Sequence, residues 1–146
     1  MKILKKVSKE MGDHAKKDAP LEACGYLASK DGIIMVSYPL ANIDKSSEHF
    51  SFDPKEQITV VRNARAKGMD ISAVYHSHPS SPARPSVEDI KLAHDPDMVY
   101  VIVSLAGSKE DIRAFEIKND KVTPVKLELI NDEKELLKKN SGGKHG

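Results

Sequence analysis

The sequence predicts a single α/β or α+β domain in which a mixed β-sheet is flanked by helices. Segments with helical spacing of apolar residues alternate along the chain with runs rich in β-branched residues, as in layered α/β architectures. Residues 98–105 are apolar almost without alternation, which is typical of a central strand covered on both faces. The chain has 146 residues, 39% of them hydrophobic, an ordinary size for one domain with a sizeable core. We expect this domain to occupy residues 1–130.

The chain should begin with a helix and a hairpin. Four apolar residues recur at helical spacing: Ile3, Leu4, Val7 and Met11. They predict a helix that runs to about Lys17. Residues 22–29 and 33–40 are apolar stretches on either side of Lys30-Asp31-Gly32, a turn signal that predicts a hairpin.

The middle of the chain predicts a helix, a strand and a shorter helix. Asp53 can cap a helix whose first residue is Pro54, and Gly68 can adopt the positive φ that ends it. Residues 70–78 contain β-branched and aromatic residues in rough alternation and should form a strand. The second helix is expected at 86–94.

The chain should then return to strands. We expect these at 98–105, 111–118 and 122–129, with a turn at Asn119-Asp120 between the last two. Residues 131–146 are dominated by Asp, Glu, Lys and Gly and are predicted to be a polar, disordered tail.

Two histidines and an aspartate in the middle of the chain are suited to bind a metal. His76 and His78 are two residues apart on the predicted strand, so their side chains share a face. Ser86 is a good cap for the following helix, and Asp89 lies in its first turn. Two imidazoles and a carboxylate are three of the four ligands of Zn²⁺ at a catalytic site, with the fourth position left for water. The pattern predicts a zinc hydrolase.

Each half of this pattern also has a simpler interpretation. Ser86 and Asp89 are spaced as a plain capping box, which many helices use without any metal. A His-x-His pair alone can equally be unrelated to metal. The two halves together are much less expected by chance than either one alone.

The combined pattern resembles the motif of the JAMM (MPN+) metalloproteases, which is an upstream Glu, His-x-His-Pro, six intervening residues and Ser-x-x-Asp. This chain has Glu22, then His76-Ser77-His78-Pro79, then Ser86-Val87-Glu88-Asp89. The resemblance implies a JAMM/MPN (cytidine deaminase-like) sandwich and one Zn²⁺ per chain, held by His76, His78 and Asp89. It also implies that Glu22 is the general base for zinc-bound water and that Ser86 donates a hydrogen bond to the oxyanion.

The resemblance also implies a substrate class. JAMM enzymes cleave peptide or isopeptide bonds after the C-terminal Gly-Gly of ubiquitin-like proteins. This compact chain looks like the stand-alone prokaryotic branch, whose substrates include small sulfur-carrier proteins and their conjugates, so a sulfur carrier is the expected partner. A deubiquitinase-like isopeptidase acting on other conjugates remains an alternative. So does a noncatalytic MPN-type interaction module, although such modules usually lack one or more of the five motif residues.

Composition argues against several other functions. Lys and Arg total 23 against 22 Asp and Glu, so the net charge of +1 gives no reason to expect a nucleic-acid partner. No apolar run approaches the ~20 residues that span a bilayer, and lysines interrupt the start of the chain, so we expect a cytoplasmic protein without a membrane partner. A single cysteine excludes an intramolecular disulfide and the Pro-Cys-x-x-Cys ligands of zinc nucleobase deaminases.

Cys24 and the remaining histidines need their own interpretation. Cys24 is either a small core residue or a thiol beside the zinc site that makes the enzyme sensitive to oxidation. His14, His94 and His145 are expected to be structural or solvated. His49 is of more interest, because the loop around it corresponds to a region that borders the substrate groove in related enzymes.

Overall fold

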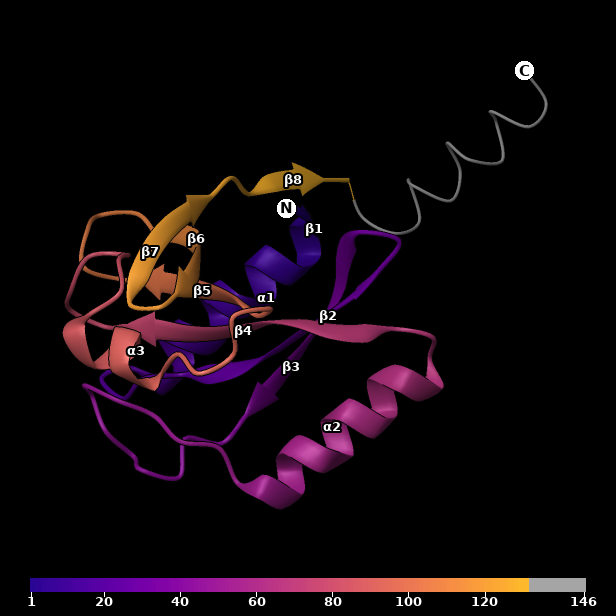
Figure 1. Cartoon of the computed structure of the whole chain (residues 1–146). Helices are drawn as coiled ribbons and strands as arrows, with labels where there is room; N and C mark the ends of the chain where they lie inside the picture. The colour runs from indigo at the N-terminus through magenta and orange to yellow at the C-terminus, as the bar shows by residue number, and fades with distance from the viewer. Residues whose placement is uncertain (132–146) are drawn as a thin grey trace.

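The computed structural model describes residues 1–131 and shows an eight-stranded mixed sheet with helices on both faces (Figure 1). The strands are β1 (Lys2–Leu4), β2 (Cys24–Lys30), β3 (Ile33–Leu40), β4 (Asp70–His78), β5 (Val99–Ser104), β6 (Asp111–Lys118), β7 (Lys121–Val125) and β8 (Glu128–Ile130). The helices are α1 (Lys5–Asp18), α2 (Pro54–Ala66) and α3 (Val87–Leu92). The predicted fold class is therefore confirmed.

The strand order is β7-β6-β5-β4-β2-β3-β1-β8. Strand β4 pairs in parallel with β5, and β1 pairs in parallel with both β3 and β8, while the other pairs are antiparallel. The two edge strands β7 and β8 are consecutive along the chain and only Lys126 and Leu127 separate them. The sheet is therefore curled, and its two edges lie near each other (Figure 1).

Alternation along the strands assigns each helix to a face. Tyr75 of β4 belongs to the main core, which includes the buried residues of α1: Val7, Met11 and Ala15. Ile102 of β5 points to the other face, where Ile90 of α3 packs against its cluster. Ala64 of α2 packs on Ala28 of β2, the neighbour of a residue in the main core. Helix α1 thus covers one face, and α2 and α3 cover the other face, to which His76 and His78 of β4 point.

The first helix is confirmed as far as Asp18, but two predicted element boundaries were wrong. Ile3 and Leu4 do not start a helix but lie in β1, fully buried, and α1 begins at Lys5. A strand of three residues is too short for alternation to distinguish it from the start of a helical stripe. The expected strand at 122–129 is two strands, because β7 pairs with β6 whereas β8 pairs with β1 at the opposite edge of the sheet. The predicted tail at 131–146 lies, after residue 131, outside the described residues.

The remaining boundaries are close to those expected. The hairpin is confirmed, except that β2 begins at Cys24 and Glu22 therefore precedes the strand. The strand at Asp70–His78 is confirmed, and the short helix ends at Leu92 rather than at residue 94. No helix within the described part of the chain is long and apolar enough to cross a membrane.

Candidate metal centre and active site

The two predicted imidazole ligands lie at the end of an interior strand. Strand β4 is held between β2 and β5, which fixes its backbone on both sides. His76 and His78 are 3% and 4% exposed, and their Nε2 atoms are 3.1 Å apart. Both rings are buried, and β4 therefore presents two imidazole nitrogen atoms close to one point.

Asp89 reaches the same point from the first turn of α3. Its Oδ2 lies 3.2 Å from Nε2 of His76 and 3.0 Å from Nε2 of His78. The same oxygen accepts a hydrogen bond from the backbone N–H of Ser86, whose hydroxyl accepts one from the N–H of Asp89, each 3.0 Å long. Asp89 thus belongs to both the capping box and the metal-ligand group, and its hydrogen bonds with Ser86 hold its carboxylate in place.

These separations match a tetrahedral zinc site. Bonds of ~2.0–2.1 Å to a tetrahedral ion place neighbouring ligand atoms ~3.3 Å apart. The three observed separations are 3.0, 3.1 and 3.2 Å. Mg²⁺ and Ca²⁺ favour oxygen ligands, so two imidazoles favour zinc or a similar transition metal. The three residues can hold a metal ion, and their chemistry and spacing fit zinc.

The surroundings of His78 and His76 also suit their use as metal ligands. Its Nδ1 lies 2.8 Å from the carbonyl oxygen of Pro82, which can accept only if Nδ1 carries the proton, so the Nε2 lone pair is left for a metal. Nδ1 of His76 is buried without a hydrogen-bond partner among residues 1–131, and the ring stacks on Phe50 with centroids 4.9 Å apart. One ligand is therefore oriented by a hydrogen bond and the other by an aromatic contact.

Burial and mutual contact shift the pKa values of this group. Burial alone would raise the pKa of Asp89, but hydrogen bonds from His76 and His78 outweigh it and lower that pKa well below its usual range. Burial alone would lower the pKa of His78, but its contacts with Asp89 and Pro82 raise it. Before any metal binds, the site therefore favours an ionised carboxylate beside a protonated imidazole.

Glu22 is a buried carboxyl group near these ligands. It is 3% exposed, and its Oε1 has no hydrogen-bond partner in the described part of the chain. Burial raises its pKa to about 8, with a smaller opposing effect from the charge of His78. A carboxyl group with a pKa near neutrality and a free oxygen is poised for proton transfer.

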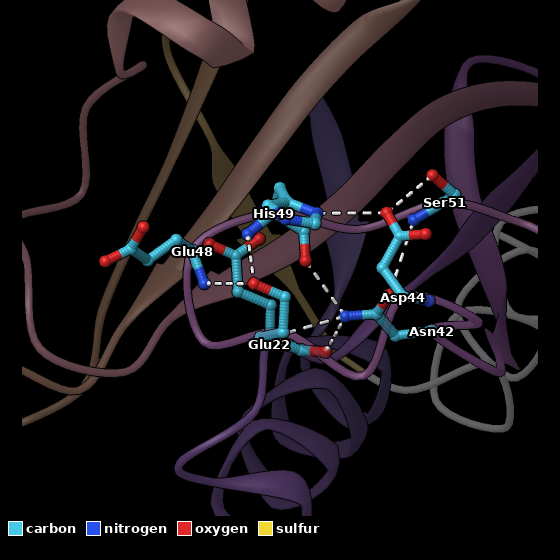
Figure 2. Close-up of polar contacts among 7 residues, drawn as sticks. Glu22, Asn42, Asp44, Glu48, His49 and Ser51 are labelled. Atoms are coloured by element: carbon cyan, nitrogen blue, oxygen red, sulfur yellow. Dashed lines mark hydrogen bonds and ion pairs between the residues drawn. The ribbon is translucent and has the colours of Figure 1, made fainter.

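The backbone of Glu22 is held by the loop between β3 and α2 (Figure 2). Its N–H donates to the carbonyl oxygen of Ser46 at 2.8 Å, and its carbonyl oxygen accepts from Nδ2 of Asn42 at 3.1 Å. Asn42 also binds the backbone of His49 (3.0 Å) and of Ser51 (3.3 Å). This amide joins Glu22 to the loop that carries Phe50, a link that no sequence pattern indicated.

Comparison with known proteins identifies the family. Residues 4–118 match the model of the family described as prokaryotic homologs of the JAB domain. The chain belongs to this family. It is 33% identical over 120 residues to the CysO-cysteine peptidase of Mycobacterium tuberculosis, an alignment that covers 80% of this chain and 82% of that protein. It is 34% identical over 103 residues to a probable TtuB-protein conjugate cleaving protease of Thermus thermophilus, covering 70% and 66% of the two chains.

Solved structures place the JAB domain in the JAMM/MPN fold. A protein from Desulfitobacterium hafniense superimposes with a TM-score of 0.83 and 43% identity, over 90% of this chain and 93% of that one. A structure described as JAMM, a metalloprotease-like zinc site in the proteasome and signalosome, superimposes with a TM-score of 0.58 and 21% identity, over 90% and 98% of the two chains. The resemblance inferred from the five motif residues is confirmed.

Cys24 of this JAB domain is a core residue. It is fully buried, and its thiol donates a 3.7 Å hydrogen bond to the carbonyl oxygen of Leu40. Burial raises the pKa of the thiol to about 12, so very little thiolate forms at neutral pH. These features favour the structural alternative over an oxidation-sensitive thiol.

The other histidines have varied surroundings. His14 is not freely exposed on its helix: its Nδ1 lies 2.7 Å from the hydroxyl of Tyr75 and its Nε2 lies 3.0 Å from Asp18. His94 is exposed, and His145 lies outside the described residues. His49 lies 3.0 Å from Asp44 and borders a cavity beside the metal ligands.

Proposed function

We propose that this protein is a zinc-dependent peptidase or isopeptidase that hydrolyses the bond after the C-terminal Gly-Gly of a small ubiquitin-like or sulfur-carrier protein. The observation that carries the proposal is the meeting of two imidazole nitrogens and one carboxylate oxygen within 3.0–3.2 Å of one another. The buried Glu22 carboxyl group, which lacks a partner at Oε1 among the described residues, supports the same chemistry.

The proposed mechanism assigns one task to each residue. Nε2 of His76, Nε2 of His78 and Oδ2 of Asp89 hold the ion. Bound zinc lowers the pKa of a coordinated water and polarises the scissile carbonyl. Glu22 accepts a proton from the attacking water and transfers it to the departing amine, a contribution of typically ~10²–10⁴ in rate. The carbon–nitrogen bond then breaks, and the products are a glycine carboxylate and a free amine.

Ser86 is proposed to stabilise the developing negative charge. Among the described residues its hydroxyl is engaged as an acceptor, from the N–H of Asp89. Its hydrogen can therefore be donated to the carbonyl oxygen under attack, a role worth about 10²–10³ in kcat for a comparable donor. No covalent intermediate with the protein is required.

The substrate class is proposed from the relatives and from the chemistry of glycine. One relative is named for CysO-cysteine and another for conjugates of a TtuB protein. Two glycines have no side chains, so an extended tail can enter a narrow channel and bring its last carbonyl to the ion.

The central experiment combines substrate and mutant. Candidate carriers extended beyond Gly-Gly are incubated with the zinc-loaded protein, and product masses are measured. We expect cleavage directly after the second glycine. Glu22→Ala should keep its fold and its zinc but lose hydrolysis by ~10²–10⁴. Cleavage at other positions would refute the substrate class, and near-normal turnover by Glu22→Ala would refute its role as base.

A further inference from the structure

A small apolar cavity lies directly beside the candidate metal centre. Its volume is about 40 Å³, and its walls include the two ligands His76 and Asp89. The other walls include Phe50 from the loop, Leu92 from α3, and Tyr100, Ile102 and Ile117 from the sheet. Glu22 and His78 do not border it. The cavity is thus adjacent to the ligand group but distinct from the point where the three ligand atoms meet.

The position of the cavity indicates which side of the scissile bond it can bind. In the proposed substrate, the two residues before the scissile bond are glycines and have no side chain to place there. The first side chain before them starts about 7 Å further along an extended chain. The cavity is walled by two of the metal ligands, so it lies closer to the reacting carbonyl than this first side chain does. The group best placed to enter it is therefore the one attached to the departing nitrogen.

We propose that this cavity is a specificity pocket for the side chain of the residue joined to the terminal glycine, and that it selects a small, weakly polar side chain. The inference rests on the proposed function, which it deepens by naming the chemistry of the departing group. Leu92 and Phe50 are its main specificity-determining residues, because they come from α3 and from the loop rather than from the sheet.

The lining sets the polarity of the side chain. Ile102 and Ile117 are 1% and 3% exposed and form the part nearest the core. The hydroxyl of Tyr100 is engaged with the backbone N–H and carbonyl of Asp95, both at 3.3 Å. Phe50 is stacked on His76, so its ring is held against the cavity. The polar side chains in the walls are already engaged: His76 and Asp89 belong to the ligand group, and His49 lies 3.0 Å from Asp44. A charged side chain entering this lining would therefore lose its hydration and gain little in return.

The volume sets the size of the side chain. One water molecule needs roughly 10–15 Å³ of such space, so 40 Å³ holds a few heavy atoms but not an aromatic ring. Ile102 and Ile117 line the cavity and are almost fully buried, so it does not lead to solvent on their side. A lysine stem that must continue to the backbone of a conjugated protein cannot pass through it.

The small size of the cavity also bears on whether the scissile bond is a peptide or an isopeptide bond. A nitrogen in a peptide bond carries a Cα atom from which a side chain branches at once. A lysine isopeptide nitrogen carries an unbranched methylene group and presents no such branch. The cavity therefore favours a residue joined through its α-amine, with alanine and cysteine as the best fits in size and polarity.

The test uses the carrier cleaved in the experiment above, extended after Gly-Gly by Ala, Cys, Ser, Asp or Trp, or joined to the ε-amine of lysine. We measure kcat/KM with the zinc-loaded full chain. A methylene in an apolar pocket changes discrimination by about 10-fold to 200-fold. We therefore expect Ala and Cys to exceed Asp, Trp and the lysine conjugate by at least about 10-fold.

Substitutions at the mouth of the cavity should reshape this ranking. Leu92 is 54% exposed, so it can be changed at little cost in folding. Leu92→Ala should raise kcat/KM for the Trp extension relative to the Ala extension. Leu92→Phe should lower that ratio further below its wild-type value. Ile58→Ala is the matched control, because Ile58 is 52% exposed on α2 and does not border the cavity.

The outcomes separate this inference from the proposed function. If extensions are cleaved with equal kcat/KM, or if both Leu92 variants keep the wild-type ranking, the pocket assignment is wrong while the hydrolase remains. If no extension and no conjugate is cleaved, the proposed function fails and the pocket assignment falls with it. A ranking that shifts in both Leu92 variants but not in Ile58→Ala supports the pocket.

Discussion

Ser86 has two proposed roles, and an alanine substitution would remove both at once. Its hydroxyl caps α3 by accepting from the N–H of Asp89 and is proposed to donate to the oxyanion. Glycine is almost as good a cap as serine, whereas alanine costs ~1 kcal/mol. Ser86→Gly should therefore leave the melting temperature and zinc affinity nearly unchanged while kcat falls about 10²–10³-fold. If Ser86→Gly keeps wild-type kcat and only Ser86→Ala loses it, the serine acts as a cap alone.

The pKa values around the ligands predict how zinc binding depends on pH. Burial raises the pKa of Glu22 to about 8, and contacts with Asp89 and Pro82 raise that of His78. Glu22 therefore holds a proton near pH 7, and His78 holds its proton more strongly than a free imidazole does; a nearby divalent cation expels both. Zinc affinity should fall as pH decreases from about 8 to 5, and activity should fall with it.

Calorimetry in buffers of different ionisation enthalpy can count the protons released on zinc binding at pH 7. Glu22→Gln should release fewer protons than the wild type, whereas Glu10→Gln, at an exposed position on α1, should release the same number. The raised pKa of Glu22 also lowers the stability of the metal-free fold as pH rises from about 4.5 to 8, because the unfolded chain loses this proton first. Equal proton release by Glu22→Gln and wild type would contradict this account.

At the same scale, the sequence could predict the ligands but not their surroundings. His76 and His78 share a strand face and Asp89 lies in the first turn of a capped helix, and both patterns are local. Glu22 was recognised only through the family motif, because nothing near it in the chain shows that it is buried. The contacts of Asn42 with the Glu22 carbonyl and of Phe50 with His76 join residues distant in sequence. No spacing rule finds such pairs.

Among the elements, β2 depends on one close contact. A Cβ atom on Gly25 would overlap the carbonyl oxygen of Tyr38 and lie 2.5 Å from the ring of Tyr75. Backbone and a fully buried ring cannot yield easily, so Gly25→Ala should destabilise the fold by at least ~1–3 kcal/mol. Its neighbour Cys24 pairs with His76, so zinc affinity should fall as well.

Thermal unfolding and zinc titration of Gly25→Ala check this expectation. Gly107→Ala is the matched control, because the nearest atom to a Cβ there is 3.7 Å away. The control should match the wild type in both measurements. A Gly25→Ala protein as stable as the control would mean that the Tyr38 backbone in β3 and the Tyr75 ring in β4 can move away without cost.

The elements that sequence patterns missed are the ones that close the sheet. Strands β1 and β8 each have three residues, and their pairing with each other joins the two ends of the described chain. Periodicity needs more residues than this to identify a strand. The longer strands, where alternation or a continuous apolar run is complete, were predicted nearly to the residue at Asp70–His78 and Val99–Ser104.

Across the whole molecule, the contacts that close the curled sheet lie apart from the candidate metal centre. The N-terminal amine donates to the carbonyl oxygen of Lys126 at 2.6 Å, and the N–H of Glu128 donates to the carbonyl oxygen of Met1 at 2.9 Å. These contacts lie at the β8 edge, whereas His76 and His78 lie on β4, with β2, β3 and β1 between β4 and β8. Strand β8 should therefore contribute to stability and not to metal binding.

Truncation tests this separation and the predicted domain end near residue 130. A chain that ends at Asn131 keeps all the strands of the described residues and should retain the melting temperature and zinc affinity of the full chain. A chain that ends at Leu127 loses β8 and leaves one side of β1 unpaired, where the backbone can pair with other chains. It should melt a few degrees lower, for a loss of ~1–3 kcal/mol from the missing apolar contacts, and aggregate more readily. Its zinc affinity should still match that of the full chain, because β4 and α3 are unchanged. Loss of zinc binding in the shorter chain, at temperatures where it remains folded, would show that the curled edge and the metal centre are coupled through the sheet.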